Sequence, residues 1–161
     1  MTRVGIGYDI HPFVLGRPLV LGGINIPFEK GLDGDSDADV LTHAIIDAIL
    51  GAMGHGDIGR VLGVGTPDVM GISSIVLLER TYHRLSSNGY KVINIDSTII
   101  AQVPKLTPHI LKMRDKLAGV LQVTPDAINI KSTTHKHLGY LGSGEAIAVH
   151  AIVQISQLSD E

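Results

Sequence analysis

The sequence predicts an α+β fold in a single domain over residues 1–161. Hydrophobic residues make up 44% of the chain against 18% charged residues, which is enough apolar side chain to build a folded core. Segments with the period of a strand alternate in close order with segments that have the period of a helix. We find neither an internal repeat nor a low-complexity linker that would divide the chain. The apolar excess also leaves room for a subunit interface.

Strands open the chain. Residues 3–8 are expected to form the first strand, and residues 19–21 and 24–26 a tight hairpin. Gly22 and Gly23 separate the two short strands, and this pair supplies the positive φ angles that such a turn requires.

An apolar helix follows a small and acidic loop. The loop covers residues 31–39, and residues 40–53 then place apolar side chains at helical spacing. Ser36 or Asp37 is available as the N-cap of this helix. The helix carries His43 among apolar neighbours.

The second half of the chain continues the alternation. Residues 54–71 are rich in glycine and show no convincing period, so this long loop is a candidate binding element. The elements expected after it are a helix over 73–88, a strand over 90–101, a helix over 107–121, and strands over 128–134 and 147–155.

Charge and composition exclude several classes of function. The chain has 13 Lys and Arg against 16 Asp and Glu, so it has no basic excess that suits a nucleic-acid backbone or an anionic membrane. No apolar run reaches the length of a membrane span, and the N-terminus lacks a signal-like apolar segment. We therefore expect a soluble, cytoplasmic protein. Because cysteine is absent, any metal must be held by His and carboxylate side chains.

Asp9, His11 and His43 form the strongest candidate metal site. Asp9 and His11 lie two residues apart at the end of the first strand, so both side chains point to the same side. An imidazole on an apolar helix is costly to bury without a partner, which makes His43 the natural third ligand. Two His and one Asp with an open fourth position suit catalytic zinc. The alternative is that His43 is a core residue that bonds to a carbonyl.

Three further segments carry weaker signals. Asp47 lies one helical turn after His43, where it can accept a proton from the free ring nitrogen. The run 33–39 fails the pattern of a calcium loop, because its sixth and twelfth positions are alanines. Thr133 and Thr134 lead into a glycine-rich turn that suits phosphate oxygens, although those glycines serve equally well to turn the chain into the last strand.

Together, these segments resemble the 2-C-methyl-D-erythritol 2,4-cyclodiphosphate synthase family almost from end to end. Their order and spacing are highly specific. In chain order the matching residues are Gly7-Tyr8-Asp9-Ile10-His11, Leu21-Gly22-Gly23, Ile26-Pro27, Ser36-Asp37-Ala38-Asp39-Val40 with His43 and Asp47, Gly56-Asp57-Ile58-Gly59, Ile99-Ile100-Ala101-Gln102 with Pro104-Lys105-Leu106, and Lys131-Ser132-Thr133-Thr134 before Leu138-Gly139.

The resemblance implies roles for individual residues. Zinc, or another divalent transition metal, would bind at Asp9, His11 and His43, and Thr134 would be the catalytic residue. The residues implied in substrate binding are Asp9, His11, Ser36, Asp57, Ile58, Gly59, Ala101, Pro104, Lys105, Leu106, Thr133 and Thr134.

The resemblance also implies a fold, an assembly and a reaction. The fold would be a mixed β-sheet covered by helices, assembled as a homotrimer whose active sites lie at subunit contacts. The reaction would be a cyclisation of a cytidine diphosphate substrate that expels CMP, in non-mevalonate isoprenoid biosynthesis. A noncatalytic zinc-binding homologue, acting as a nucleotide-binding or scaffold trimer, is the alternative. A zinc phosphohydrolase is disfavoured because the sequence shows no obvious base for activating water.

Some positions depart from the family pattern. Asp35 stands where the family has a histidine, residues 62–67 replace an acidic loop, and Ser143 replaces an arginine. Lys136 stands in place of the acidic ligand for a second divalent ion. The resemblance therefore implies that the ordinary magnesium or manganese ligand is lost.

Overall fold

Five strands form a mixed sheet in the computed structural model, which describes residues 1–158 and leaves 159–161 of the expected domain outside the described residues. The strand order is β4-β1-β7-β5-β6. Only β5 and β6 pair in parallel, and the other neighbours are antiparallel. The strands are β1 (Thr2–Leu15), β4 (Lys30–Leu32), β5 (Tyr90–Ile100), β6 (Ile128–Thr133) and β7 (Ala146–Gln157). The α+β prediction is confirmed.

The predicted hairpin is present as a separate two-stranded sheet. β2 (Leu19–Leu21) and β3 (Ile24–Ile26) pair antiparallel. Gly22 and Gly23 have φ angles of 57° and 71°, so both turn residues occupy the left-handed region that glycine adopts without a steric penalty.

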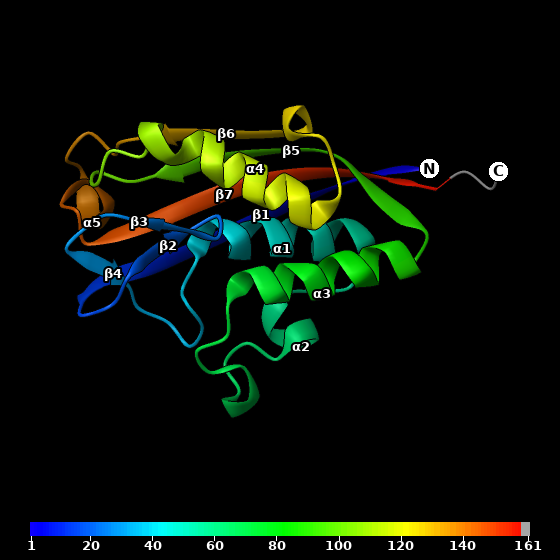
Figure 1. The fold of residues 1–161 in the computed structure, drawn as a ribbon, viewed down its shortest axis with the longest axis horizontal. Helices are drawn as coiled ribbons and strands as arrows, with labels where there is room; N and C mark the ends of the chain where they lie inside the picture. The colour runs from blue at the N-terminus through cyan, green and yellow to red at the C-terminus, as the bar shows by residue number, and fades with distance from the viewer. Residues whose placement is uncertain (159–161) are drawn as a thin grey trace.

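Helices cover one face of the large sheet. Figure 1 shows α1, α3 and α4 on the same side, with α4 over the strands β5 and β6. The core between the two layers includes Ile45 and Ile49 of α1 and Val149 and Val153 of β7. The helices are α1 (Val40–Met53), α2 (Ile58–Leu62), α3 (Ser74–Ser87), α4 (Ile110–Leu121) and α5 (Gly139–Gly142), with short 3-10 turns at Pro67–Val69, Thr107–His109 and Pro125–Ala127. Within residues 1–158, none of the helices is long and apolar enough to cross a bilayer.

Two glycines of β1 bring α1 close to the sheet. A Cβ on Gly5 would lie 1.9 Å from the Ala48 carbonyl oxygen, and one on Gly7 would lie 1.9 Å from the Ala44 carbonyl oxygen. Only glycine permits this approach. The close packing places His43 of α1 beside the segment of β1 that follows Gly7.

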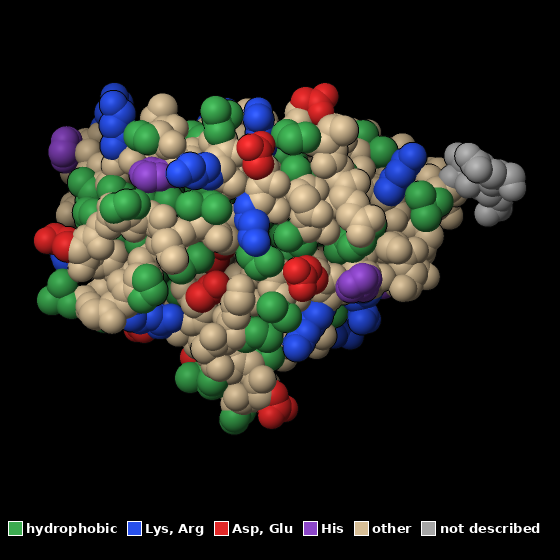
Figure 2. All heavy atoms as spheres, viewed as in Figure 1, with side chains coloured by type: hydrophobic (Ala, Val, Ile, Leu, Met, Phe, Trp, Pro, Cys, Tyr) green, Lys and Arg blue, Asp and Glu red, His purple; other side chains and the backbone are tan. Residues whose placement is uncertain are grey.

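The opposite face of β1 is apolar but exposed. Val4, Ile6 and Tyr8 alternate with the buried glycines and are 65%, 69% and 46% exposed. Ile152 of β7 lies opposite Ile6 and is 49% exposed. We call these four residues the apolar strip. Figure 2 shows the helix side instead, where charged side chains are scattered between hydrophobic ones.

The structure corrects the expected N-cap of α1. The cap is Asp39, whose side chain accepts hydrogen bonds from Thr42 N at 3.0 Å and Thr42 Oγ1 at 2.7 Å. The same carboxylate accepts the amides of Gly22 and Gly23, so it also fixes the β2–β3 turn. Burial raises the pKa of Asp39. Its tertiary role was not visible in the local sequence pattern.

Other differences concern the ends of strands. β1 continues to residue 15 instead of ending at 8, because residues 9–12 pair with 146–149 of β7. Polar site residues interrupt the alternation of apolar side chains there, so the sequence pattern of a strand ends before β1 itself ends.

The sequence analysis did not predict β4 or the short helices α2 and α5, because segments of three to five residues are too short to show a period.

Candidate active site

Asp9, His11 and His43 converge as the sequence predicts. Asp9 Oδ2 lies 2.9 Å from His11 Nε2 and 3.1 Å from His43 Nδ1, and the two ring nitrogens are 3.4 Å apart. One potential ligand atom from each residue lies within 4.8 Å of the other two. Three such atoms around one point fit a divalent metal ion with an open coordination position. We call these residues the metal trio.

One strand and one helix position the metal trio. Asp9 and His11 alternate on β1, so the strand presents both on the helix side. His43 lies in the first turn of α1, and its side chain is 5% exposed compared with 26% for Asp9. The site therefore opens to solvent on the Asp9 side and is closed on the α1 side.

The electrostatics of the trio favour a bound cation. Burial alone would raise the pKa of Asp9, but hydrogen bonds and charge interactions with His11 and His43 more than offset it and lower the pKa to about 2. Burial alone would lower the pKa of His11, yet the hydrogen bond with Asp9 and its charge raise it. Asp9 is thus ionised at neutral pH, ready to contribute an anionic ligand.

The outer nitrogens of both histidines are also engaged. His11 Nδ1 lies 2.7 Å from the carbonyl oxygen of Asp33. His43 Nε2 lies 2.8 Å from Ser74 Oγ and 3.1 Å from Ser36 Oγ. These contacts orient the rings so that the remaining nitrogen of each faces Asp9.

Asp47 does not take the predicted role beside His43. Its Oδ1 accepts the amide of Ile58 at 2.8 Å and so ties the start of α2 to α1. Burial raises the pKa of Asp47, and the charges of Asp9 and Asp57 raise it further. The expected position one turn after His43 is correct, but the ring of His43 turns its Nε2 toward α3 instead.

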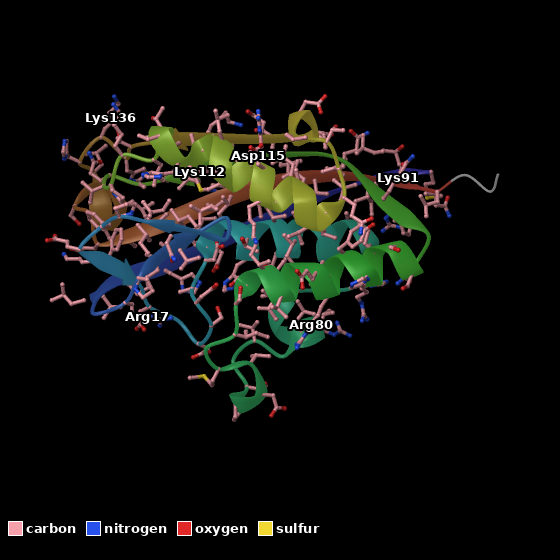
Figure 3. The ribbon with its side chains drawn as sticks, viewed as in Figure 1. Arg17, Arg80, Lys91, Lys112, Asp115 and Lys136 are labelled. Atoms are coloured by element: carbon pink, nitrogen blue, oxygen red, sulfur yellow. The ribbon has the colours of Figure 1, made fainter. Side chains whose placement is uncertain are left out.

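Arg17 holds the loop before α1 and was not singled out by the sequence. Its guanidinium donates to the carbonyl oxygens of Gly34, at 2.7 Å, and of Ser36, and it pairs with Asp33 at 3.4 Å. Figure 3 shows Arg17 at the end of the molecule where this loop lies. The side chain thereby fixes the loop next to the Asp33 carbonyl that orients His11, an effect that no local spacing in the sequence signals.

A pocket of about 420 Å³ opens at the ends of β5 and β6. Six of the residues that the resemblance implied in substrate binding line this pocket. The lining residues are Ala101, Gln102, Val103, Pro104, Lys105, Leu106, Thr107, Ser132, Thr133 and Thr134, of which Gln102, Val103, Thr107 and Ser132 were not predicted as site residues. Thr134 is exposed, and its Oγ1 accepts the amide of Lys136 at 3.3 Å.

Two parts of the expected site lie away from this pocket wall. Ser36 is buried against His43. Asp57 caps α2 by accepting the amide of Arg60 at 2.9 Å, with Ile58 and Gly59 between the two. Ser36 therefore lies at the metal trio, whereas Asp57, Ile58 and Gly59 lie at the start of α2, which Asp47 ties to α1.

The metal trio and the pocket lie in the same row of the sheet but on different strands. Asp9 pairs with Val149, Val149 with Ile99, and Ile99 with Ser132. Three strand spacings thus separate Asp9 from Ser132, a distance of about 14 Å. Within one chain the metal trio and the pocket are therefore separate features.

The turn that follows Thr134 has an unusual backbone. Lys136 and His137 have φ angles of 53° and 61°, which non-glycine residues rarely adopt. The turn is held by the His135 ring, whose Nδ1 lies 2.8 Å from the carbonyl oxygen of Leu138, and by Gln102, which accepts the His137 amide at 3.3 Å. Figure 3 shows Lys136 at the outer edge of the molecule.

Comparison with known families decides the relationship. A model described as the YgbB family matches residues 2–156, nearly the whole chain. The chain belongs to the YgbB family. The matched range contains the residues of both the metal trio and the pocket.

Two similar proteins carry the same name. A protein of Caldicellulosiruptor bescii is 51% identical over 157 residues, covering 98% of this chain and 100% of its own. A protein of Pelotomaculum thermopropionicum is 53% identical over 153 residues, covering 95% and 94%. Both are named 2-C-methyl-D-erythritol 2,4-cyclodiphosphate synthase.

Solved structures agree with the fold. The bifunctional IspDF of Campylobacter jejuni has a TM-score of 0.95 and 37% identity, and the alignment covers 99% of this chain but 43% of that longer one. The IspF of Plasmodium falciparum, solved as a CDP complex, has a TM-score of 0.87 and 31% identity, with 98% and 97% of the chains covered.

Proposed function

We propose that this protein is a 2-C-methyl-D-erythritol 2,4-cyclodiphosphate synthase. It converts 4-diphosphocytidyl-2-C-methyl-D-erythritol 2-phosphate to the cyclic diphosphate and CMP. The observation that carries the proposal is the presence of both a metal trio and a nucleotide-sized pocket in a chain that is about half identical to synthases over nearly its full length. The noncatalytic alternative has no comparable support.

The reaction needs positioning and charge neutralisation more than covalent chemistry. An oxygen of the substrate's 2-phosphate attacks the β-phosphorus, the new P–O bond closes the ring, and the bond to the α-phosphate oxygen breaks to release CMP. No enzyme nucleophile takes part. The protein therefore has to fold the substrate back on itself and hold its phosphates in line.

The pocket residues and the residues near α1 each bind a different part of the substrate in this proposal. Ala101, Pro104, Lys105 and Leu106 bind the cytidine end in the pocket, and the hydroxyls of Thr133 and Thr134 donate to diphosphate oxygens. Thr134 acts at the reacting phosphate and is the catalytic residue of the proposal. On the α1 side, Asp57, Ile58 and Gly59 bind the methylerythritol hydroxyls, and Ser36 lies beside the metal ligands.

Zinc, or another divalent transition metal, is the proposed cofactor of the metal trio. The set of one carboxylate and two imidazoles fits zinc, and the exposed side of Asp9 leaves access for a phosphate oxygen. When bound, the ion supplies Lewis-acid polarisation of the phosphate. Asp9, His11 and His43 would hold it, and this would place Asp9 and His11 next to the substrate phosphate. Lys136 makes a second divalent ion, magnesium or manganese, unnecessary in this proposal.

A homotrimer completes the site by bringing the pocket of one copy to the metal trio of the next. Two observations support it. Asp9 and the pocket are about 14 Å apart in one chain by strand spacing, and the apolar strip leaves Val4, Ile6, Tyr8 and Ile152 largely exposed. Packing of these strips around a shared axis removes that surface from water.

A turnover assay tests the proposed activity. Zinc-loaded protein is incubated with the cytidine diphosphate substrate, and products are followed by phosphorus NMR. We expect CMP and the cyclic diphosphate in equal amounts. His43→Ala is expected to abolish both products and to release the zinc, whereas His83→Ala, on the exposed surface of α3, is the matched control. CMP without a ring indicates a hydrolase, and no product indicates the noncatalytic homologue.

A further inference from the structure

A serine on α3 lies against the outer nitrogen of His43. Ser74 is the first residue of α3 and is fully buried, and its Oγ is 2.8 Å from His43 Nε2. Helix α3 is separate from both β1 and α1, the strand and the helix that carry the metal trio. Helix α3 therefore reaches the site through this one hydroxyl.

Asp37 determines how Ser74 can bond. Asp37 Oδ1 accepts the hydroxyl proton of Ser74, and Asp37 Oδ2 accepts the Ser74 amide at 3.0 Å. Asp37 Oδ1 also accepts the amide of Asp39 at 3.2 Å, so the carboxylate itself is fixed by the loop before α1. A carboxylate has only acceptor atoms, so the hydrogen bond between Asp37 Oδ1 and Ser74 Oγ must use the hydroxyl proton of Ser74.

The proton between Ser74 and His43 must then belong to the imidazole. A hydroxyl has a single proton, and that of Ser74 points to Asp37. The short contact of 2.8 Å requires a donor, and the only one left is His43 Nε2–H. With the Nε2 proton held by Ser74, Nδ1 is the nitrogen of His43 that is left to bind a metal ion, and it lies 3.1 Å from Asp9 Oδ2, to which it can donate a proton when no ion is bound.

Ser36 lies near the same nitrogen but does not determine its state. Its Oγ is 3.1 Å from His43 Nε2 and accepts the amide of Ala38 at 3.1 Å. If Ser36 donated to Nε2 instead, two lone pairs would face each other across the shorter Ser74 contact. The Ser74 bond therefore decides the tautomer, and Ser36 is a secondary neighbour.

We propose that Ser74, held by Asp37, is a positioning residue that keeps His43 in the Nε2-protonated tautomer and directs its Nδ1 lone pair to the metal. The proposal rests on the metal centre of the proposed function. It gives α3 a part in metal binding, since the N-terminus of this helix and the loop before α1 are joined by the same Asp37 side chain. Hydrogen bonds to the outer nitrogen of a metal-bound histidine commonly fix its tautomer and orientation.

Zinc affinity is the first measurement. The zinc Kd of the native protein is determined by competition with a chelator and compared with Ser74→Ala, Ser36→Ala and Ser97→Ala. Ser97 is the matched control, because it is equally buried and its hydroxyl bonds to the Asn129 carbonyl in the sheet. We expect Ser74→Ala to weaken zinc by roughly tenfold to a hundredfold, Ser36→Ala by less, and Ser97→Ala not measurably.

The nitrogen chemical shifts of His43 provide a second measurement that needs no variant to fold. In the zinc-loaded native protein, nitrogen-15 NMR should show His43 bound to zinc through Nδ1, with a proton on Nε2 that exchanges slowly with water. In zinc-loaded Ser74→Ala, that proton should exchange faster and the Nε2 shift should move. Zinc bound through His43 Nε2 would overturn the proposal, as would Ser74→Ala with an unchanged spectrum and unchanged zinc affinity. A native protein that binds no zinc shows instead that the metal centre itself is wrong.

Discussion

Gly7 of β1 and Ala44 of α1 are packed so closely that a Cβ on the glycine would lie 1.9 Å from the Ala44 carbonyl oxygen. Ala44 follows His43, and Asp9 lies two residues after Gly7. The contact between strand and helix therefore sets the distance between two of the three metal ligands. The geometry of the site therefore depends on the lack of a side chain at Gly7 as well as on the three ligands.

Gly7→Ala tests this contact. The added methyl must push α1 away from β1, so we expect a loss of about 3 kcal/mol in the free energy of unfolding, together with weaker zinc binding. Urea unfolding of the zinc-free protein measures the stability. Gly119→Ala, where a Cβ on α4 meets nothing within 4 Å, is the matched control and should stabilise by up to ~1 kcal/mol. Equal stability of Gly7→Ala and the native protein would contradict the packing argument.

Zinc affinity should depend on pH through His11. Asp9 raises the pKa of His11 above its ordinary value of 6.5, and a protonated imidazole must lose its proton to bind metal. Above the His11 pKa the affinity is constant, and below it the apparent zinc Kd rises by about tenfold per pH unit. Asp9, with a pKa of about 2, stays ionised throughout. Chelator competition across the pH range measures the zinc Kd. A zinc affinity that stays constant to well below pH 6.5 would exclude a raised pKa of His11 as the cause of the pH dependence.

Assembly should depend on the apolar strip. Ile6→Asp places a charge in the middle of the strip, so we expect the trimer to dissociate and turnover to fall to background. Leu111→Asp is the control, because Leu111 on α4 is 61% exposed but lies on the helix side. Light scattering at micromolar concentration gives the oligomeric state. A native protein that is monomeric there contradicts the shared site.

Lys136 should make turnover independent of magnesium. An ammonium meets phosphate oxygens directly, whereas a carboxylate in its place reaches them only through a bound cation. With zinc saturating, we expect the native protein to be slow but indifferent to magnesium, and Lys136→Glu to gain a magnesium response. Lys136→Gln, which removes the charge without adding a metal ligand, should lose turnover at every magnesium concentration. A native protein that requires millimolar magnesium would rule this role out.

The sequence was most informative where local pattern and tertiary role coincide. The span of α1 and the turn at Gly22 and Gly23 follow directly from period and from backbone freedom, and the structure has both as predicted. The metal trio could be proposed because alternation along β1 places Asp9 and His11 on one side, and because a histidine on an apolar helix needs a polar partner.

Contacts between distant segments were the part that sequence reasoning could not supply. Ser74 reads locally as a helix start, and Asp37 as an N-cap, yet the structure joins them to each other and to His43. Asp39 takes the cap instead, because its carboxylate also meets the β2–β3 turn. These partners are set by the packing of α1 against α3 and the hairpin, which no spacing along the chain encodes.

Mixed trimers test the central claim, that cyclisation takes place where the metal trio of one copy meets the pocket of another. His43→Ala destroys the trio, and Thr134→Trp fills the pocket from an exposed position. Each variant alone should be inactive. When both are co-expressed with different tags and mixed trimers are isolated, each contains one junction with an intact trio and an intact pocket, so turnover to the cyclic diphosphate should recover to about a third of the native value. Mixed trimers as inactive as the single variants would show that the two halves do not meet across a subunit contact.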